Sequence, residues 1–123
     1  MITTEEFQKR IKEKLKNIEE MFNKKNAQYG ERNNPIQNFT NGALLLFGDK
    51  YTNELQIHGA HETLKAYVAK HIIHIYNNDI TGNKVDESIM DTVIYFLIDS
   101  VFHDLYMEGI EDELRESETG TFE

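Results

Sequence analysis

The chain has 123 residues, no cysteine, and 13 Lys and Arg against 22 Asp and Glu, which gives a formal net charge of −9. This length fits one domain with its own core, and the absence of cysteine excludes disulfides, iron–sulfur clusters and thiolate zinc sites. The negative charge argues against direct DNA binding, because a DNA-binding surface must be positive to meet the phosphates.

The first residues, Met-Ile-Thr-Thr-Glu-Glu, contain no basic segment leading into an apolar one, so we expect no signal peptide. No apolar run approaches the length of a membrane span, so we expect no membrane association. These features predict a cytoplasmic protein of a bacterium or of a phage-infected cell.

The first predicted helix ends at Tyr29, just before a glycine. At its start, Thr3 and Glu6 have the spacing of a capping box. Its apolar residues recur in steps of four and three and form a narrow stripe: Phe7, Ile11, Leu15, Ile18 and Phe22. Glu19 flanks this stripe and Lys25 lies on it. A lysine at such a position either covers the edge of a core or reaches towards a phosphate.

Two further helices are expected before the centre of the chain. The second is short, over residues 36–47, with Asn34 as its cap. The third runs from a cap at Thr52 to about residue 76. The run Leu44-Leu45-Leu46-Phe47 is apolar enough on the exposed side of the second helix to favour self-association.

The fourth predicted helix, from about Asp86 to Tyr106, is apolar nearly all round and is therefore expected to be buried at the centre of the domain. Glu87 and Asp91 lie one helical turn apart at its entrance. One interpretation is that they bind a divalent metal. The alternative is that Asp86 caps the helix while Glu87 interacts with the helix dipole.

The remainder of the sequence completes an all-α organisation. From Glu108 onward the chain is acidic and lacks apolar spacing, so we expect a helical domain over residues 1–115 and a flexible acidic tail over 116–123. No apolar alternation predicts strands. The predicted fold is a four-helix, up-and-down-like bundle with a short second helix and a frayed end.

A polar patch on the third helix admits two interpretations. Residues three and four apart are neighbours on a helix, so one patch contains His58, His61 and Glu62. These side chains either bind a transition metal or form a solvated face. For a magnesium site, which uses carboxylates together with substrate phosphates, Glu62 and Glu19 are the best additions to Glu87 and Asp91.

The order of several short motifs resembles a known family. These motifs are Lys25-x-x-x-Tyr29-Gly30, Asn38-Phe39 with Ala43, Lys70-His71, and Asp86-Glu87-Ser88-Ile89-x-Asp91-Thr92-x-x-Tyr95. Over roughly residues 15–105 the chain resembles the small helical "nucleotide modification associated" domains of phages and their hosts. Those domains are in turn similar to the MazG-like all-alpha nucleotide pyrophosphohydrolases.

The resemblance implies a MazG-like bundle that binds Mg²⁺, or Mn²⁺, and cleaves a nucleoside triphosphate to a monophosphate and pyrophosphate. It also implies a dimer or higher homo-oligomer. Position by position, it assigns Glu87 and Asp91 to metal binding and catalysis. The residues assigned to the phosphate or base of the substrate are Lys25, Tyr29, Asn38 and Lys70.

The acidic motifs depart from the pattern of that superfamily. Its first helix usually offers Glu-x-x-Glu, whereas here Glu19 is followed by Phe22. Its second element is usually Glu-x-x-Asp, and here Glu87 and Asp91 are one residue further apart. The resemblance therefore does not imply a complete four-carboxylate site.

Two other functions fit the same sequence. The first is a non-enzymatic phage counter-defence protein, which sequesters a signalling nucleotide or presents an acidic, nucleic-acid-like surface to a basic host protein. The second is a structural helical module that assembles through an apolar face.

Overall fold

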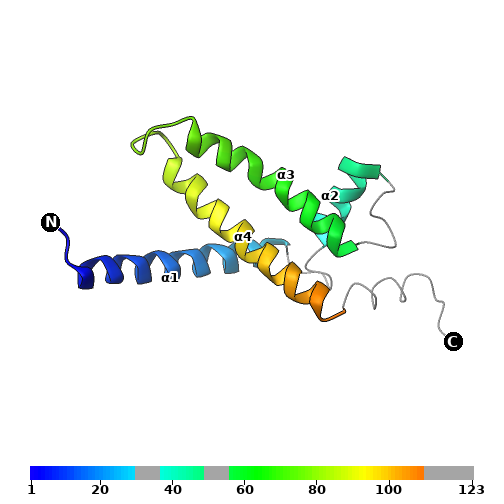
Figure 1. Ribbon diagram of the computed structural model, residues 1–123, viewed down its shortest axis with the longest axis horizontal. Helices are drawn as coiled ribbons and strands as arrows, with labels where there is room; N and C mark the ends of the chain where they lie inside the picture. Colours follow the sequence, from blue (N-terminus) through cyan, green and yellow to red (C-terminus); the bar gives the residue numbers. More distant parts are fainter. Residues whose placement is uncertain (30–36, 49–55, 110–123) are drawn as a thin grey trace. The chain divides into compact units, whose positions relative to one another are not determined.

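The structure is a computed structural model that describes residues 1–29, 37–48 and 56–109. The chain consists of two compact units, Met1–Pro35 and Ile36–Glu123, whose residues contact one another mainly within each unit. Each unit is described by itself. The described residues form four α-helices and no strand, which confirms the all-α prediction (Figure 1). The predicted caps Asn34 and Thr52 and the predicted tail over 116–123 lie outside the described residues.

The first unit contains helix α1, Thr4–Tyr29. Its predicted cap is confirmed, because the Glu6 backbone N–H donates to the Thr3 hydroxyl at 3.1 Å. One turn later, Arg10 pairs with the Glu6 side chain at 3.2 Å. The stripe residues Phe7, Ile11, Leu15 and Phe22 are exposed by 39–57%, whereas Ile18 is buried. The helix is thus amphipathic and presents apolar side chains at its surface.

The second unit contains α2 (Gln37–Phe47), α3 (Gln56–Tyr76) and α4 (Val85–Met107). Helices α3 and α4 lie side by side as an antiparallel hairpin, and α2 packs on α3 (Figure 1). The apolar core of this unit comes from all three helices: Phe39, Ile57, Ala60, Leu64, Val68 and Phe102. Burial of these side chains is the main term that holds the three helices together.

Gly42 lies at a close approach between α2 and α3. A Cβ atom built at this glycine would lie 2.6 Å from Cγ2 of Thr63 and would collide with the hydroxyl of Tyr67. One turn earlier, the Phe39 ring packs at 5.2 Å from Phe102 and 5.9 Å from Tyr67. The glycine is therefore explained by helix packing, although it lowers the intrinsic stability of α2.

Helix α4 begins differently from the prediction. Its N-cap is Lys84, which adopts a left-handed conformation (φ 61°, ψ 15°) and makes no side-chain capping bond. The prediction that Asp86 is the cap is wrong, because Asp86 already lies inside the first turn together with Glu87. The loop is closed instead by its backbone, where Val85 N–H donates to the Gly82 carbonyl at 3.3 Å.

Helix α4 is also less enclosed than its composition predicts. Ile94 and Phe102 are buried, but Phe96, Leu97 and Val101 are each about half exposed, at 51–54%. In the described structure only one side of α4 is therefore covered. Among the described helices, none combines the length and the apolar character that crossing a membrane requires.

Candidate functional site

The histidines of α3 mark the polar side of the α3–α4 hairpin. All four contact α4 or the loop that precedes it, in the pairs His58–Tyr106, His61–Asp99, His71–Asp91 and His74–Asn83. As the α3 residue number rises, the number of its partner falls, which is the register of an antiparallel hairpin. We call the end next to the loop over residues 77–84 the loop end, and the opposite end the far end.

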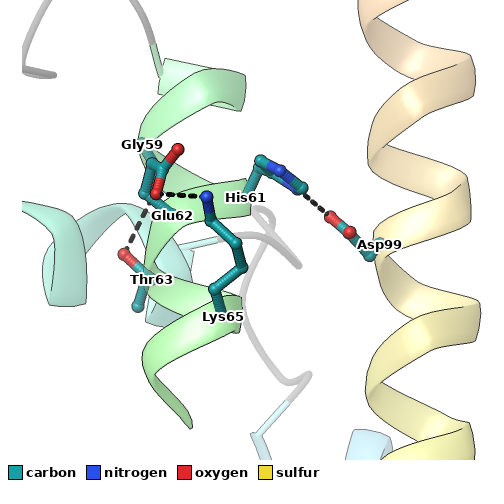
Figure 2. Close-up of polar contacts among 6 residues, drawn as sticks. All are labelled: Gly59, His61, Glu62, Thr63, Lys65 and Asp99. Atoms are coloured by element: carbon teal, nitrogen blue, oxygen red, sulfur yellow. Dashed lines mark hydrogen bonds and ion pairs between the residues drawn. The ribbon is translucent and has the colours of Figure 1, made fainter. Parts of the chain in front are cut away.

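At the far end, His61 and Asp99 form a short hydrogen bond between the two helices (Figure 2). Nδ1 of His61 donates to Oδ1 of Asp99 at 2.6 Å, and the side chains are 46% and 22% exposed. The neighbouring Glu62 is paired with Lys65 at 2.8 Å on the same helix. Exposed pairs of this kind contribute little to stability, so this end is a solvated polar surface that connects two helices.

At the loop end, Asp91 is one of the few buried polar residues of the described chain, with 8% of its surface exposed. Its Oδ2 lies 3.8 Å from Nδ1 of His71, whose ring also packs against Tyr95 with a centroid separation of 5.9 Å. No buried side-chain nitrogen or oxygen among the described residues lacks a hydrogen-bond partner. The carboxylate of Asp91 is therefore largely shielded from solvent and lies against His71 of the neighbouring helix.

Three of the predicted site residues belong to the loop-end half of the hairpin. Glu87 is exposed and precedes Asp91 by one turn of α4, and Lys70 is exposed and adjacent to His71 on α3. Because His71 contacts Asp91, the hairpin register brings Lys70 and both carboxylates to the same part of the molecule. Two carboxylates and one lysine in this half are residue types that can bind a metal ion and a phosphate.

Glu62 is not brought to this group. It precedes His71 by nine residues on α3, which corresponds to roughly 13 Å along the helix axis. Glu62 pairs instead with Lys65 on the same helix, and its side chain points away from Asp99 (Figure 2). The structure therefore gives Glu62 no place beside Asp91 as a shared metal ligand.

The other predicted residues lie elsewhere in the chain. Glu19 and Lys25 are exposed residues of α1, in the other compact unit. Tyr29 ends α1, and its side chain is outside the described part of the structure. Asn38 is exposed at the start of α2, next to Phe39, whose ring contacts Tyr95 at 6.5 Å.

The described residues include no group of three or more His, Cys, Asp or Glu side chains placed to hold a metal ion. Of the predicted metal ligands, two carboxylates, Glu87 and Asp91, belong to the loop-end half. This number fits Mg²⁺, which commonly retains water and binds through one or two carboxylates together with substrate phosphates. It does not fit a structural zinc site, which needs four protein ligands.

Two residues of the hairpin were not identified as site residues from the sequence. His71 appeared only as part of the Lys70-His71 motif, and Asp99 was not singled out. Their partners become recognisable once the bounds of α3 and α4 are known, because His61–Asp99 and His71–Asp91 then fall at nearly matched levels. Helix periodicity alone does not supply that register.

Comparison of the chain with protein-family models, with curated proteins and with solved structures finds no match.

Proposed function

We propose that this chain binds a nucleoside triphosphate together with Mg²⁺ at the loop end of the α3–α4 hairpin and hydrolyses it to a monophosphate and pyrophosphate. The observation that carries the proposal is the buried carboxylate of Asp91. It is held between the helices, with Glu87 one turn before it and Lys70 next to its partner His71. The resemblance of the motif order to the nucleotide modification associated domains supports the same assignment.

Each residue has a distinct role in this proposal. Asp91 and Glu87 hold the metal, which neutralises phosphate charge and lowers the pKa of water when it is bound. Lys70 is a mobile point charge suited to a phosphate oxygen. His71 touches the carboxylate of Asp91, so it acts as a positioning residue behind a metal ligand.

Release of pyrophosphate from a panel of ribo- and deoxyribonucleoside triphosphates, with Mg²⁺ or Mn²⁺, tests the proposal. We expect metal-dependent release by the native chain. Asp91→Asn removes the charge and keeps the shape, and it should reduce kcat/KM by more than about 100-fold. Lys70→Gln should raise KM by about tenfold, because a single phosphate contact is lost.

The far end of the hairpin supplies matched controls. Glu62→Gln and Asp99→Asn each remove one carboxylate charge from the same two helices, outside the proposed site. Both variants should retain the native rate. An equal reduction of kcat/KM in Asp91→Asn and Asp99→Asn would contradict the proposal that the active site lies at the loop end.

The same nucleotides, tested for thermal stabilisation, separate hydrolysis from sequestration. A ligand that binds only the folded state raises the unfolding temperature whether or not it is cleaved. Stabilisation that requires Asp91 but yields no pyrophosphate would favour a nucleotide-sequestering protein. An absence of both effects would contradict nucleotide binding at this site.

A further inference from the structure

The exposed side of α4 carries a continuous apolar stripe. Its residues follow one another at steps of four, three and one: Ile89, Val93, Phe96 and Leu97. Side chains at these steps lie on one face of a helix. Phe96 and Leu97 are about half exposed, Ile89 is exposed by 41%, and Val93 is half-buried. Contiguous exposed apolar side chains of this kind indicate a surface that binds another macromolecule.

Acidic residues lie beyond both ends of this stripe. Asp86 precedes Ile89 by three residues and Asp104 follows Leu97 by seven, so both continue the line of the stripe. Both are exposed, and the Asp104 carboxylate lies 3.7 Å from the ring of His103 on the same helix. The distance between the two acidic positions corresponds to about 27 Å along the helix axis. The surface is therefore an apolar stripe with a negative charge at each end.

The rest of α4 has the same sign of charge. The helix contains Asp and Glu residues but no Lys or Arg. Asp104 also lies in the last turn, where the helix dipole places partial negative charge and an acidic side chain is unfavourable. A cation that a partner brings to this end would relieve that repulsion. A partner with positive charge at both ends is therefore favoured.

These charges argue against two other occupants of the surface. An antiparallel pair of α4 helices from two copies would place Asp86 of one copy near Asp104 of the other. A parallel pair would place each of these residues near its own counterpart. Both arrangements bring like charges together across an interface, which is costly. An anionic membrane surface would be repelled for the same reason.

We propose that the exposed face of α4 binds an amphipathic helix of a partner protein, with apolar residues on one side and a Lys or Arg near each end. The stripe accepts the apolar side of that helix, as helix-binding surfaces do, and Asp86 and Asp104 face its basic residues. The basic residues would lie about five helical turns apart.

This role is independent of the hydrolase proposed above, because none of the stripe residues is assigned to the metal or to the phosphate. It also differs from a nucleic-acid-like acidic surface, since the main contact is apolar and the charges set which helix is accepted.

Fluorescence anisotropy of labelled synthetic peptides with the full chain tests the proposal. The probe is a helical peptide of about 24 residues, with Leu at steps of three and four on one face and Lys at both ends. A second peptide has Glu in place of Lys, and a third has the composition of the probe in scrambled order. We expect the probe to bind at least about tenfold more tightly than either of the others. Equal binding of the probe and the scrambled peptide would overturn the proposal, because net charge alone would then explain the binding.

Two matched substitutions locate the apolar contact. Leu97→Ser should weaken binding of the probe by more than about tenfold, because it removes a large side chain from the stripe. Leu45→Ser removes an equally large side chain that is 87% exposed on α2, and it should leave binding unchanged. Equal losses in the two variants would overturn the proposal. So would a native chain that self-associates and becomes monomeric with Leu97→Ser, because a second copy would then occupy the stripe.

The charge at the end of the stripe is tested in the same way. Asp104→Asn should weaken binding of the probe by about threefold at low salt, and this difference should shrink as salt rises. Its control is Glu62→Gln, which removes one carboxylate from α3 and should leave binding unchanged. An equal effect of the two substitutions would contradict the placement of the basic residues. Circular dichroism of each variant verifies that the helices remain folded.

Discussion

The two ends of the α3–α4 hairpin contain the same kind of polar pair but use it in different surroundings. At the far end, the His61–Asp99 hydrogen bond is short and accessible to solvent, on the half of the hairpin that carries most of the apolar core. At the loop end, His71 and Asp91 are more buried and further apart, at 17% and 11% side-chain exposure and 3.8 Å.

If the proposed function holds, residues that stabilise the fold and residues that act on the substrate occupy opposite ends of the same two helices. Phe39 of α2 packs with Leu64 and Phe102 on the far half, so that half contributes apolar burial. The loop half instead contains the buried carboxylate of Asp91, together with the exposed residues Lys70 and Glu87. Buried ionisable groups are costly to retain and mark candidate functional sites. Three variants test whether this separation holds.

Leu64→Ala should have the largest effect on stability. Leu64 is fully buried in the core of the far half, and its truncation leaves a cavity. We expect a loss of about 3 kcal/mol in the free energy of unfolding, measured by urea denaturation. Nucleotide binding by the folded fraction should be unchanged. Leu45→Ala, at an exposed position, should change stability by less than about 0.5 kcal/mol.

Gly42→Ala, in the same half of the hairpin unit, should lower the free energy of unfolding by an intermediate amount. Alanine improves helix propensity, but its methyl group would collide with Thr63 and Tyr67. Thr63 cannot easily move, because it is fully buried and its hydroxyl donates to the Gly59 carbonyl at 2.8 Å (Figure 2). We expect a net loss of about 1–2 kcal/mol. A more stable Gly42→Ala variant would show that α2 does not approach α3 as described.

Asp99→Asn should lower the free energy of unfolding least of the three variants. The His61–Asp99 pair is partly exposed, so its loss should cost only about 0.5 kcal/mol. Thermal unfolding at low and high salt measures this difference, which should shrink as salt rises. A loss of stability as large as that caused by Leu64→Ala would mean that the far end is stabilised by its polar pair rather than by its apolar core.

The sequence predicted local structure well because local structure depends on nearby residues. The Thr3 cap of α1, the end of α1 at Tyr29 and the short α2 all follow from caps, glycines and apolar spacing. The start of α4 was displaced, because Lys84 adopts a left-handed conformation that no local pattern demands.

The candidate site was less predictable because it depends on register between helices. Glu87 and Asp91 share a helix, so their proximity could be calculated from spacing alone. Glu62 was matched to them by residue type, but it lies nine residues before His71 on α3 and pairs with Lys65. That register depends on the length of the loop and on the packing of α3 against α4, and helix periodicity contains neither.

The loop between α3 and α4 has a consequence for how this unit folds. It spans only residues 77–84, and His74 holds it by donating from Nε2 to the Asn83 carbonyl at 2.8 Å. Closing a loop of this size takes on the order of 10–100 ns in an unfolded chain. Contacts between α3 and α4 near the loop are therefore local in sequence and carry a small entropic cost. We expect the hairpin to form from its loop end, so that the proposed site is assembled before α2 completes the core.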